Sequence, residues 1–458
     1  MSSFVAPAFA AVRIPTVAEI RAAFPALSAP TVFLDNAGGS QVPSVVIERI
    51  REYFLNSYVQ LGADYAVSRD ATATVASAHE FVKCLMNAGG TDGSSTGRAG
   101  ADYRPGQGPG ECVLGPSTTA LCNLLANAYT QSPRAGRDEV IVSTAGHESN
   151  VGPWMRLASR GYSVKPWPAT RAADGTWEIS IDTLRPLLSS RTALVAFPHV
   201  SNILGEIVDV KAITNLVHQH GGRVVADGVA LAPHRAIDVA DWGVDWYVYS
   251  TYKVFGPHMA ALFGRREAFA EITGPNHYFI DKANLAYSFE LGGVSHEGAA
   301  GLVALYEYLS FLAGDLAVSS SRVVPTNSSL MTTSPVFDRR VVERALGVMT
   351  DLELPLQARL MEYLRDRRDI TVIGPAHAAA SRVSTISFVH RSKKSAEIAK
   401  AANARGIGFR YGSFYSVRLC ETMGLDPADG VVRVSLVHYN TMEEVERLMF
   451  TLDEILGG

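Results

Sequence analysis

The feature that most constrains the fold of this chain is a repeated order of strand, loop and helix that begins at residue 111. Five short runs rich in apolar and β-branched residues follow one another, at Glu111–Leu114, Glu139–Ser143, Ala193–Pro198, Arg223–Ala226 and Trp246–Ser250. Each run is separated from the next by a loop and a stretch with helical character. This alternation predicts an α/β fold with a mostly parallel sheet that is covered by helices on both faces.

Polar residues recur where each of these five strands ends. They are Ser117, Thr118 and Thr119 after the first strand, His147 after the second, Asn202 after the third, Asp227 after the fourth, and Ser250 with Lys253 after the fifth. In sheets of this kind, ligands bind just outside the carboxyl ends of the strands. Polar residues scattered over unrelated loops would not line up in this way. The pattern therefore predicts one binding site at this edge of the sheet.

The character of the chain changes after residue 301. Residues Gly301–Ala313 are expected to form an apolar helix and Asp338–Arg367 a long amphipathic one. Further strands are expected at Ile370–Ile373, Thr385–Val389 and Val431–Val437, and the last helix begins at a capping box, Thr441–Glu444. This mixture predicts a smaller α+β domain at the C-terminal end.

The domain organisation follows from this change. We expect a large domain over residues 31–305 and a small domain made of residues 1–30 and 306–458. Residues 89–110 are rich in Gly, Ser and Pro and have no apolar period. Such composition is typical of an exposed, mobile insertion rather than of a domain boundary.

Charge and cysteine content argue against several classes of protein. The net charge is −4 over 458 residues and there is no basic stripe, so we expect no nucleic-acid partner. The four cysteines form no CxxC pair and no Cys/His spacing typical of a metal site, so we expect neither a disulfide framework nor bound zinc. No stretch reaches the roughly 18 apolar residues of a membrane span. We expect a cytoplasmic protein, although the absence of acids before Glu19 leaves a transit peptide open.

A lysine that follows a buried strand indicates a specific chemistry. Desolvation lowers the pKa of such a lysine, and the neutral amine is a nucleophile suited to forming an imine. Pyridoxal 5′-phosphate (PLP) needs this lysine, an acid at its pyridine nitrogen, a plane that stacks on its ring and a pocket for its phosphate. Lys253 supplies the first, Asp227 is suited to the second, and His147 could supply the third.

The remaining polar residues fit the phosphate and the ring hydroxyl. Backbone N–H groups at Ser117–Thr119, with the Thr119 hydroxyl and the helix dipole, form an anion site to which Ser250 could add a contact. Asn202 could donate a hydrogen bond to the ring hydroxyl. Taken singly, each residue has an ordinary explanation as a turn, a helix cap or a hydrogen-bonded loop residue. Taken together, in this order and on this side of the sheet, they predict a PLP site.

The sequence resembles a known family, the class V aminotransferase or cysteine-desulfurase-like group of fold-type I PLP enzymes. The motifs that carry the resemblance are DNAGGS (Asp35–Ser40), HESNVGPW (His147–Trp154), HVSNILGE (His199–Glu206), DGVALAPHRAIDV (Asp227–Val239), STYKVFGP (Ser250–Pro257), ELGG (Glu290–Gly293) and RVSLVHYNT (Arg433–Thr441). Together they cover nearly the whole chain. They are specific for the superfamily and not for one reaction.

The resemblance implies roles for individual residues. The implied catalytic residues are Lys253, which forms the imine, Asp227 at the pyridine nitrogen and His147 on the ring. The implied cofactor contacts also include Thr118, Thr119, Asn202, Ser250, Tyr252 and Gly293. Arg433 matches the position that binds the substrate α-carboxylate, a task suited to the guanidinium fork. Ala37, Gly38, Asn202 and Tyr415 complete the implied substrate side. The resemblance also implies an amino-acid substrate and a homodimer.

Several positions depart from the pattern of the desulfurases. Tyr252 stands where they commonly carry a histidine, and Ala230 where they carry a glutamine. Gly293 replaces a threonine that reaches the phosphate in the partner subunit, so Ser295 or His296 could substitute for it. Tyr415 stands where the persulfide-forming cysteine is expected, and Cys420 lies five residues further on.

These departures direct the functional prediction. Without a thiolate at residue 415, sulfur transfer through an enzyme persulfide is disfavoured. We therefore expect a PLP-dependent lyase or transferase that carries out C–S β-elimination, with Lys253 as base and Tyr415, Tyr411 or Tyr252 as acid on the leaving group. Two alternatives stay open. One is transamination or epimerisation by the same cofactor, and the other is a PLP-fold protein that serves in binding or regulation.

Overall fold

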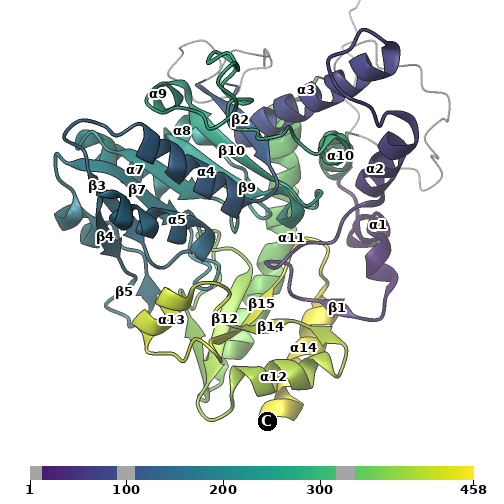
Figure 1. Cartoon of the computed structure of the whole chain (residues 1–458). Coiled ribbons are helices and arrows are strands. Elements are labelled where there is room, and N and C mark those ends of the chain that lie inside the picture. Colours follow the sequence, from purple (N-terminus) through teal and green to yellow (C-terminus); the bar gives the residue numbers. More distant parts are fainter. Residues whose placement is uncertain (1–12, 90–108, 316–335, 458) are drawn as a thin grey trace, which may run out of the picture.

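The computed structural model describes residues 13–89, 109–315 and 336–457, and its centre is a seven-stranded sheet (Figure 1). The strands, in spatial order, are β2 (Gly110–Gly115), β10 (Ala260–Arg265), β9 (Trp246–Ser250), β8 (Arg223–Asp227), β7 (Thr192–Pro198), β3 (Glu139–Ser143) and β4 (Ser163–Trp167). Only β10 runs against the others, because it pairs antiparallel with both β2 and β9. The expected α/β fold with a mostly parallel sheet is confirmed.

The sequence predicts five of these strands and misses β4 and β10. β4 lies at the edge of the sheet and has the sequence SVKPW, whose proline and lysine are typical of an edge strand and hide its strand character. β10 has the sequence AALFGR, in which two alanines and a glycine weaken the strand signal. β10 is buried because it lies between β2 and β9, and the local sequence does not specify this pairing.

Helices cover both faces of the sheet. Successive residues of a strand point to opposite faces. Val140 and Val142 of β3 accordingly pack with α4 (Thr118–Gln131) in one cluster, whereas Ile141 belongs to the cluster on the other face. The second face is covered by α3 (Ala66–Met86), α7 (Val210–Gln219), α10 (His296–Leu312) and part of α11 (Arg339–Asp366). α10 begins five residues earlier than predicted because the Ser295 side chain caps it.

A second sheet of four antiparallel strands forms the lower part of the molecule in Figure 1. Its order is β11 (Ile370–Ile373), β12 (Thr385–His390), β15 (Val431–Ser435) and β14 (Arg410–Gly412). This sheet shares a hydrophobic core with α11, α12 (Ser395–Asn403) and α14 (Met442–Leu456). The capping box predicted at the start of α14 is confirmed, with Thr441 and Glu444 as its two members.

The N-terminal part of the chain joins this second sheet. β1 (Val32–Phe33) pairs with β13 (Ile407–Gly408), and the Ser435 N–H donates to the Leu34 carbonyl at 2.7 Å. This places the turn after β1 beside β15. α1 (Val17–Ala22) and α2 (Ser44–Asn56) lie on either side of β1 along the chain.

Several short strands and α-helices connect these elements in the described part of the chain. They are β5 (Thr170–Arg171), β6 (Trp177–Glu178), α5 (Gly152–Met155), α6 (Ile181–Leu184), α8 (Val239–Trp242), α9 (Arg266–Ala270) and α13 (Val417–Met423). Most of the predicted insertion, residues 90–108, lies outside the described residues, and the expected domain boundaries stay predictions. Among the described residues, no helix has both the length and the apolar character needed to cross a membrane.

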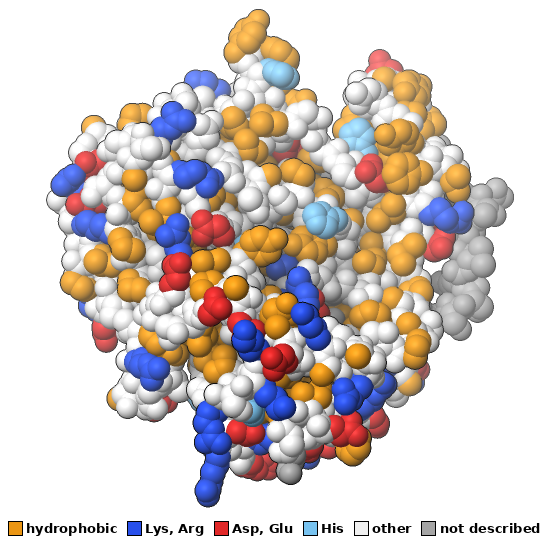
Figure 2. Space-filling model, turned by 60° about the horizontal axis from the view of Figure 1, so that its bottom comes forward, with side chains coloured by type: hydrophobic (Ala, Val, Ile, Leu, Met, Phe, Trp, Pro, Cys, Tyr) orange, Lys and Arg blue, Asp and Glu red, His pale blue; other side chains and the backbone are white. Residues whose placement is uncertain are grey.

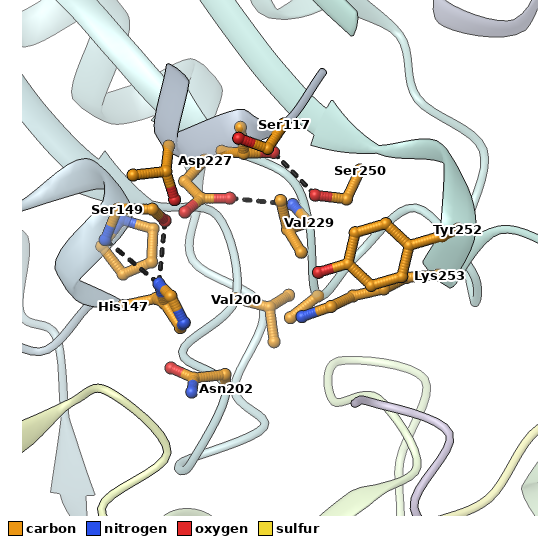
Figure 3. Close-up of a pocket in the computed structure, with 14 residues that line it drawn as sticks. Ser117, His147, Ser149, Val200, Asn202, Asp227, Val229, Ser250, Tyr252 and Lys253 are labelled. Carbon is orange, nitrogen blue, oxygen red and sulfur yellow. Dashed lines mark hydrogen bonds between the residues drawn. The ribbon is translucent and has the colours of Figure 1, made fainter. Parts of the chain in front are cut away.

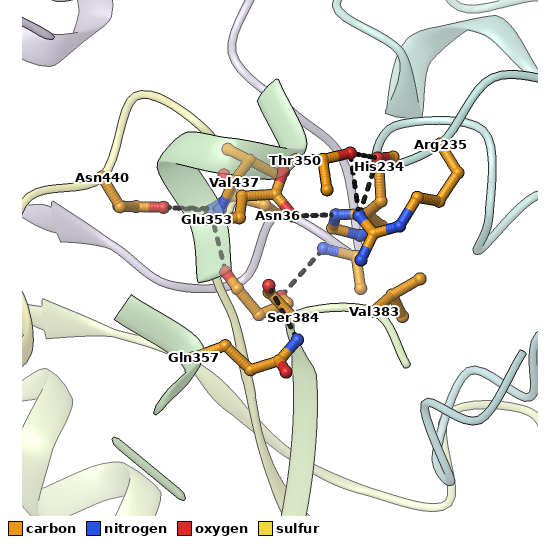
Figure 4. Close-up of polar contacts among 12 residues, drawn as sticks. Asn36, His234, Arg235, Thr350, Glu353, Gln357, Val383, Ser384, Val437 and Asn440 are labelled. Atoms are coloured by element: carbon orange, nitrogen blue, oxygen red, sulfur yellow. Dashed lines mark hydrogen bonds and ion pairs between the residues drawn. The ribbon is translucent and has the colours of Figure 1, made fainter. Parts of the chain in front are cut away.

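A buried polar network links the parallel sheet to α11 (Figure 4). His234, in the loop after β8, contacts Glu353 of α11 through Nδ1 at 2.7 Å, and both side chains are almost fully buried. The next residue, Arg235, donates to the Thr350 hydroxyl and to the Arg382 carbonyl. Because α11 also packs on the four-stranded sheet, these contacts fix the position of one sheet relative to the other.

Asp245 fixes the start of β9 against β8. Its fully buried carboxylate accepts hydrogen bonds from the backbone N–H of Val224 at 2.9 Å and from Nη1 of Arg223 at 2.8 Å, and it pairs with His218. The two strands are thereby held in the register that places Asp227 opposite Val248. The carboxyl ends of β8 and β9, where the predicted site lies, therefore depend on this contact.

We expect Asp245→Ala to lower the free energy of unfolding by about 1–3 kcal/mol, because it leaves the buried N–H of Val224 without an acceptor and removes one of the two carboxylates that pair with Arg223. Chemical denaturation followed by tryptophan fluorescence measures this loss. Asp241→Ala is the matched control, since it removes only the surface pair with Lys211 and should cost about 0.5 kcal/mol. Equal losses in the two variants would contradict this role of Asp245.

Candidate active site

The carboxyl ends of the parallel strands surround one cavity (Figure 3). The lining residues are Ser117, Thr118, Thr119, His147, Ser149, Pro198, Val200, Asn202, Asp227, Val229, Ala230, Ser250, Tyr252 and Lys253. Every residue that the strand-end pattern predicts is in this set. The sequence pattern does not predict Ser149, Pro198, Val200 or Val229, because these four lie next to the predicted residues and have no chemical signal of their own.

Lys253 lies on a single helical turn, Thr251–Lys253, directly after β9. The turn is held from both sides, because Thr251 donates to the Pro257 carbonyl and the Ser40 N–H donates to the Tyr252 carbonyl. The pKa of Lys253 is lowered to about 8, mainly by burial. The positive charge of Arg433 also lowers this pKa, and its effect is larger than the opposing effect of the Asp227 carboxylate. A substantial fraction of the amine is therefore neutral near pH 8, which suits imine formation.

Asp227 ends β8 and is buried at the back of the cavity. Its Oδ1 accepts a hydrogen bond from the Val229 N–H at 2.9 Å, and its other oxygen lies toward the cavity (Figure 3). Burial raises the pKa of Asp227 to about 6, against the opposing effects of the Val229 N–H and Lys253. A cationic N–H group placed in the cavity would keep this carboxylate ionised.

The start of α4 and the end of β9 form an anion site. The Thr118 and Ser250 hydroxyls are 2.7 Å apart and both line the cavity. The Ser117 side chain accepts from the Ala120 N–H and so caps the helix. The first N–H groups of a helix have no intrahelical partner and attract anions. Hydroxyls and the start of a 14-residue helix are together suited to a phosphate group.

His147 is a neutral ring on one side of the cavity. Its Nδ1 accepts a hydrogen bond from the Ser149 N–H at 3.1 Å. Burial lowers the pKa of His147 to about 4, and the charges of Lys253 and Arg433 act in the same direction. The side chain therefore stays uncharged at neutral pH and is suited to stacking on an aromatic ring.

Arg433 enters the site from β15 of the second sheet and is 2% exposed. Nη2 donates to Asp35 Oδ1 at 3.2 Å and Nη1 to the Asn202 carbonyl at 3.3 Å. Its Nε is buried and has no hydrogen-bond partner among the described residues. A buried donor without a partner is costly, and a carboxylate is the group that would satisfy it best.

Two tyrosines lie at the mouth of the site. Tyr415 is 71% exposed, and its ring centroid is 5.1 Å from that of His147. Tyr252 stacks on His258 at 4.4 Å, and the Lys253 amine is 5.9 Å from the centroid of the Tyr252 ring. Tyr411 is partly buried and packs against the core of the four-stranded sheet, so its predicted role as an acid is not supported.

The turn after β1 lies beside Arg433 and contains Ala37 and Gly38, which are predicted to contact the substrate. The Ala37 N–H donates to the Ser435 hydroxyl at 2.9 Å, which ties the turn to the second sheet. A side chain at Gly38 would displace the ends of the Arg410 and Asp35 side chains, so the glycine leaves room for these two groups. Asp35 and Arg410, which form an ion pair, are site residues that the sequence pattern does not single out. The only sequence signal for Asp35 is its place in the DNAGGS motif.

Several of the discussed residues are not among those that line the cavity, namely Ala37, Gly38, Gly293, Tyr411, Tyr415, Cys420 and Arg433. Two of them, Gly293 and Cys420, have surroundings that do not fit a role in the site. A side chain at Gly293 would meet no described atom within 4 Å, so this residue faces open space. Cys420 is fully buried in α13, and burial raises the pKa of its thiol to about 11. A thiol in this state is a poor nucleophile.

Comparisons with known proteins agree with this arrangement. The family model "Aminotransferase class-V" matches residues 111–315 and 344–448. The aminotransferase-like protein FGM3 of Gibberella zeae is 36% identical over 96% of this chain and 98% of its own length. The cysteine desulfurase-like protein ustD of Aspergillus flavus is 31% identical over 96% of this chain and 90% of its own length.

A solved structure shares the fold. The cysteine desulfurase CsdA from Escherichia coli superposes with a TM-score of 0.74 at 23% identity, covering 97% of this chain and 99% of CsdA. The parallel sheet, the second sheet and their relative placement are therefore those of an established PLP-enzyme fold.

We expect the rate at which Lys253 forms an imine with added PLP to rise with pH and to reach half its maximum near pH 8, because the neutral amine is the reactive form. Stopped-flow absorbance of the apoprotein measures the rate, and Nα-acetyl-lysine, measured in parallel, corrects for the ionisation of PLP itself. A midpoint near 10.5, the ordinary value for lysine, would contradict the lowered pKa.

Two variants shift this profile in opposite directions. Arg433→Gln removes a charge that lowers the pKa of Lys253, so its midpoint moves to higher pH. Asp227→Asn removes a charge that raises this pKa, so its midpoint moves to lower pH.

Proposed function

The chain belongs to the class-V aminotransferase family, and from this premise we propose that it eliminates a sulfur-bearing group from the β-carbon of an amino acid. Members of the family, cysteine desulfurases among them, use PLP, and the protein is a PLP-dependent enzyme. The observation that carries the proposal is a complete lysine, aspartate, histidine and arginine set beside an exposed tyrosine at residue 415. The four cysteines argue against sulfur transfer through an enzyme persulfide, which needs an accessible thiol. Cys84, Cys112, Cys122 and Cys420 are all buried.

The residues of the chain fit the cofactor. Lys253 would hold it covalently, and Asp227 would lie at its ring nitrogen. His147 would stack on the ring, and Thr118, Thr119 and Ser250 would hold its phosphate. When bound, PLP withdraws electrons from Cα of an attached amino acid, which acidifies the Cα proton and loosens a leaving group at Cβ.

Three residues have separate roles in the proposed reaction: one removes a proton, one stabilises a positive charge and one binds the substrate carboxylate. The Lys253 amine takes the Cα proton, because its lowered pKa leaves it able to accept a proton near neutral pH. The ionised Asp227 carboxylate would favour a protonated ring nitrogen in the bound cofactor. Arg433 binds the substrate carboxylate through its unpartnered Nε, which fixes the direction of the Cα–H bond relative to Lys253.

Elimination of this kind needs water and yields three products. A cysteine conjugate and water give pyruvate, ammonia and the free thiol. The exposed mouth of the site, where Tyr415 is 71% exposed, would let leaving groups of different size depart. A second candidate function is transamination, which the name of the FGM3 relative favours.

We expect the PLP-loaded protein to release pyruvate and thiol in equal amounts from S-substituted cysteines, with no release by Lys253→Ala. Lactate dehydrogenase coupling and a thiol reagent measure the two products. Pyridoxamine phosphate without pyruvate would instead identify a transaminase, and formation of the D-enantiomer an epimerase. A cofactor absorbance band that no amino acid changes would indicate a binding or regulatory protein.

Tyr415 is the residue that we propose as acid on the leaving group. Its ring contacts His147 at the open side of the site, whereas Tyr252 is held in a stack with His258. A tyrosine hydroxyl can protonate a departing thiolate, which matters most when that thiolate is strongly basic.

We expect Tyr415→Phe to lower kcat about 100-fold for S-alkyl cysteines, whose thiolates are basic, and much less for cysteine sulfoxides. Steady-state kinetics with both substrate types gives the comparison. Tyr252→Phe tests the other tyrosine of the site: because Tyr252 is expected to contact the cofactor, its loss should change the rates with both substrates by the same factor. If Tyr415→Phe slowed both substrates equally, Tyr415 would not be the acid.

The assembly and location of the protein stay proposals. A homodimer is supported by exposed apolar side chains on and just after α2, namely Phe54, Leu55 and Tyr58. On the face shown in Figure 2, acidic and basic side chains are interspersed and no continuous basic surface is seen. The cytoplasmic location expected from the sequence also stays a prediction.

A further inference from the structure

Two consecutive residues beside the site have a backbone conformation that side chains other than glycine rarely adopt. They are Phe414, with φ of 49°, and Tyr415, with φ of 61°. Such a conformation is strained for an aromatic residue and persists only when the surroundings hold it in place. Strained residues of this kind gather at functional sites, so the contacts of both side chains need an explanation.

The strained loop is anchored by hydrogen bonds at three successive residues. The Phe414 carbonyl accepts from Asn202 Nδ2 at 2.9 Å, and the Ser416 hydroxyl donates to Asn202 Oδ1 at 2.8 Å. Between them, the Tyr415 carbonyl accepts from the Glu148 N–H at 2.8 Å. Asn202 lies in the loop after β7, and Glu148 begins a short 3₁₀ helix (Glu148–Asn150) after β3, so both lie at the carboxyl ends of the parallel strands. The loop of the second sheet is therefore fastened to the cofactor side of the site.

The result of this anchoring is that the Phe414 ring lies against the guanidinium of Arg433. The Arg433 Cζ atom is 3.7 Å from the ring centroid, and the Arg410 Cζ atom is 5.7 Å from it. A cation on an aromatic face is attracted by the ring, most strongly when water is excluded. Arg433 is 2% exposed, so this condition is met.

The remaining contacts of Arg433 lie at the edge of its guanidinium. Asp35 accepts from Nη2 and the Asn202 carbonyl from Nη1, whereas Nε has no partner among the described residues. With its face on Phe414 and two nitrogens at its edge held, the group has little freedom to turn. A substrate carboxylate then meets a donor that is already oriented, which reduces the entropy lost on binding.

We propose that Phe414 is a positioning residue which, by holding Arg433, sets the affinity of the enzyme for the carboxylate of its amino-acid substrate. The proposal rests on one part of the proposed function, the assignment of Arg433 as the residue that binds the substrate carboxylate. It gives a physical reason for an aromatic residue at a position where glycine would adopt the backbone conformation without strain. Phe414 itself need not contact the substrate or the cofactor.

The test compares an amino acid with the amine that lacks its carboxylate. Binding of each to the PLP-loaded protein is measured by titration of the cofactor absorbance and by calorimetry, so that turnover is not required. We expect Phe414→Leu to weaken binding of the amino acid about tenfold and to leave binding of the amine unchanged. In kinetics, KM rises by the same factor while kcat changes less than twofold.

Conservative and matched variants complete the design. Phe414→Tyr keeps the ring and should bind both ligands as the unchanged protein does. Phe414→Met serves the same purpose as Phe414→Leu if the latter does not fold. Equal weakening of amino acid and amine would show that Phe414 acts on the fold of the loop alone and would overturn the proposal.

Arg433→Gln separates this inference from the proposed function. The protein is expected to bind the amino acid more tightly than the amine. If Arg433→Gln abolishes this preference and Phe414→Leu leaves it unchanged, only the role of Phe414 is wrong. If Arg433→Gln itself leaves the preference intact, the carboxylate is bound elsewhere, and the assignment of Arg433 in the proposed function fails.

Discussion

A lysine amine that is held out of water between an arginine and a carboxylate is the constraint on which the rest of this structure depends. Lys253 and Asp227 come from neighbouring strands of the parallel sheet, whereas Arg433 comes from the antiparallel one. None of the three charges is well tolerated alone in a buried cavity. The two sheets must therefore keep a fixed relative position, which the buried contact between His234 and Glu353 helps to maintain.

The substrate side of the site is built from segments far apart in the sequence. Asp35 follows β1, and Phe414 precedes α13, yet both contact Arg433. The turn that holds Asp35 is tied to β15 through Ser435, and the loop that holds Phe414 is tied to Asn202. Hydrogen bonds of this kind lock backbone conformations that the local sequence would not choose by itself. In the proposed function, recognition of a substrate carboxylate thus rests on tertiary contacts rather than on one motif.

This difference explains how far the sequence could predict the structure. Five strands and the residues at their carboxyl ends were predictable, because buried strands have a strong local pattern and parallel strands end at one edge. β10 was not, because its small residues carry a weak signal. Phe414 was not either, since a positive φ is unexpected for phenylalanine and its partner Arg433 is reached only through the fold. Gly293 was placed by resemblance alone, and its surroundings in the described chain are empty.

The charges in the site also indicate how substrate binding and proton transfer are coupled. Lys253, Arg433 and Arg410 are positive, and Asp35 and Asp227 are negative, so the group carries one positive charge in excess when Lys253 is protonated. Arg433 lowers the pKa of Lys253 because like charges repel across a medium of low dielectric constant. A carboxylate bound to Arg433 offsets this repulsion and so raises the pKa of Lys253. In the proposed function, the amine therefore becomes a stronger base once the carboxylate of an amino acid is bound, which would favour removal of the Cα proton.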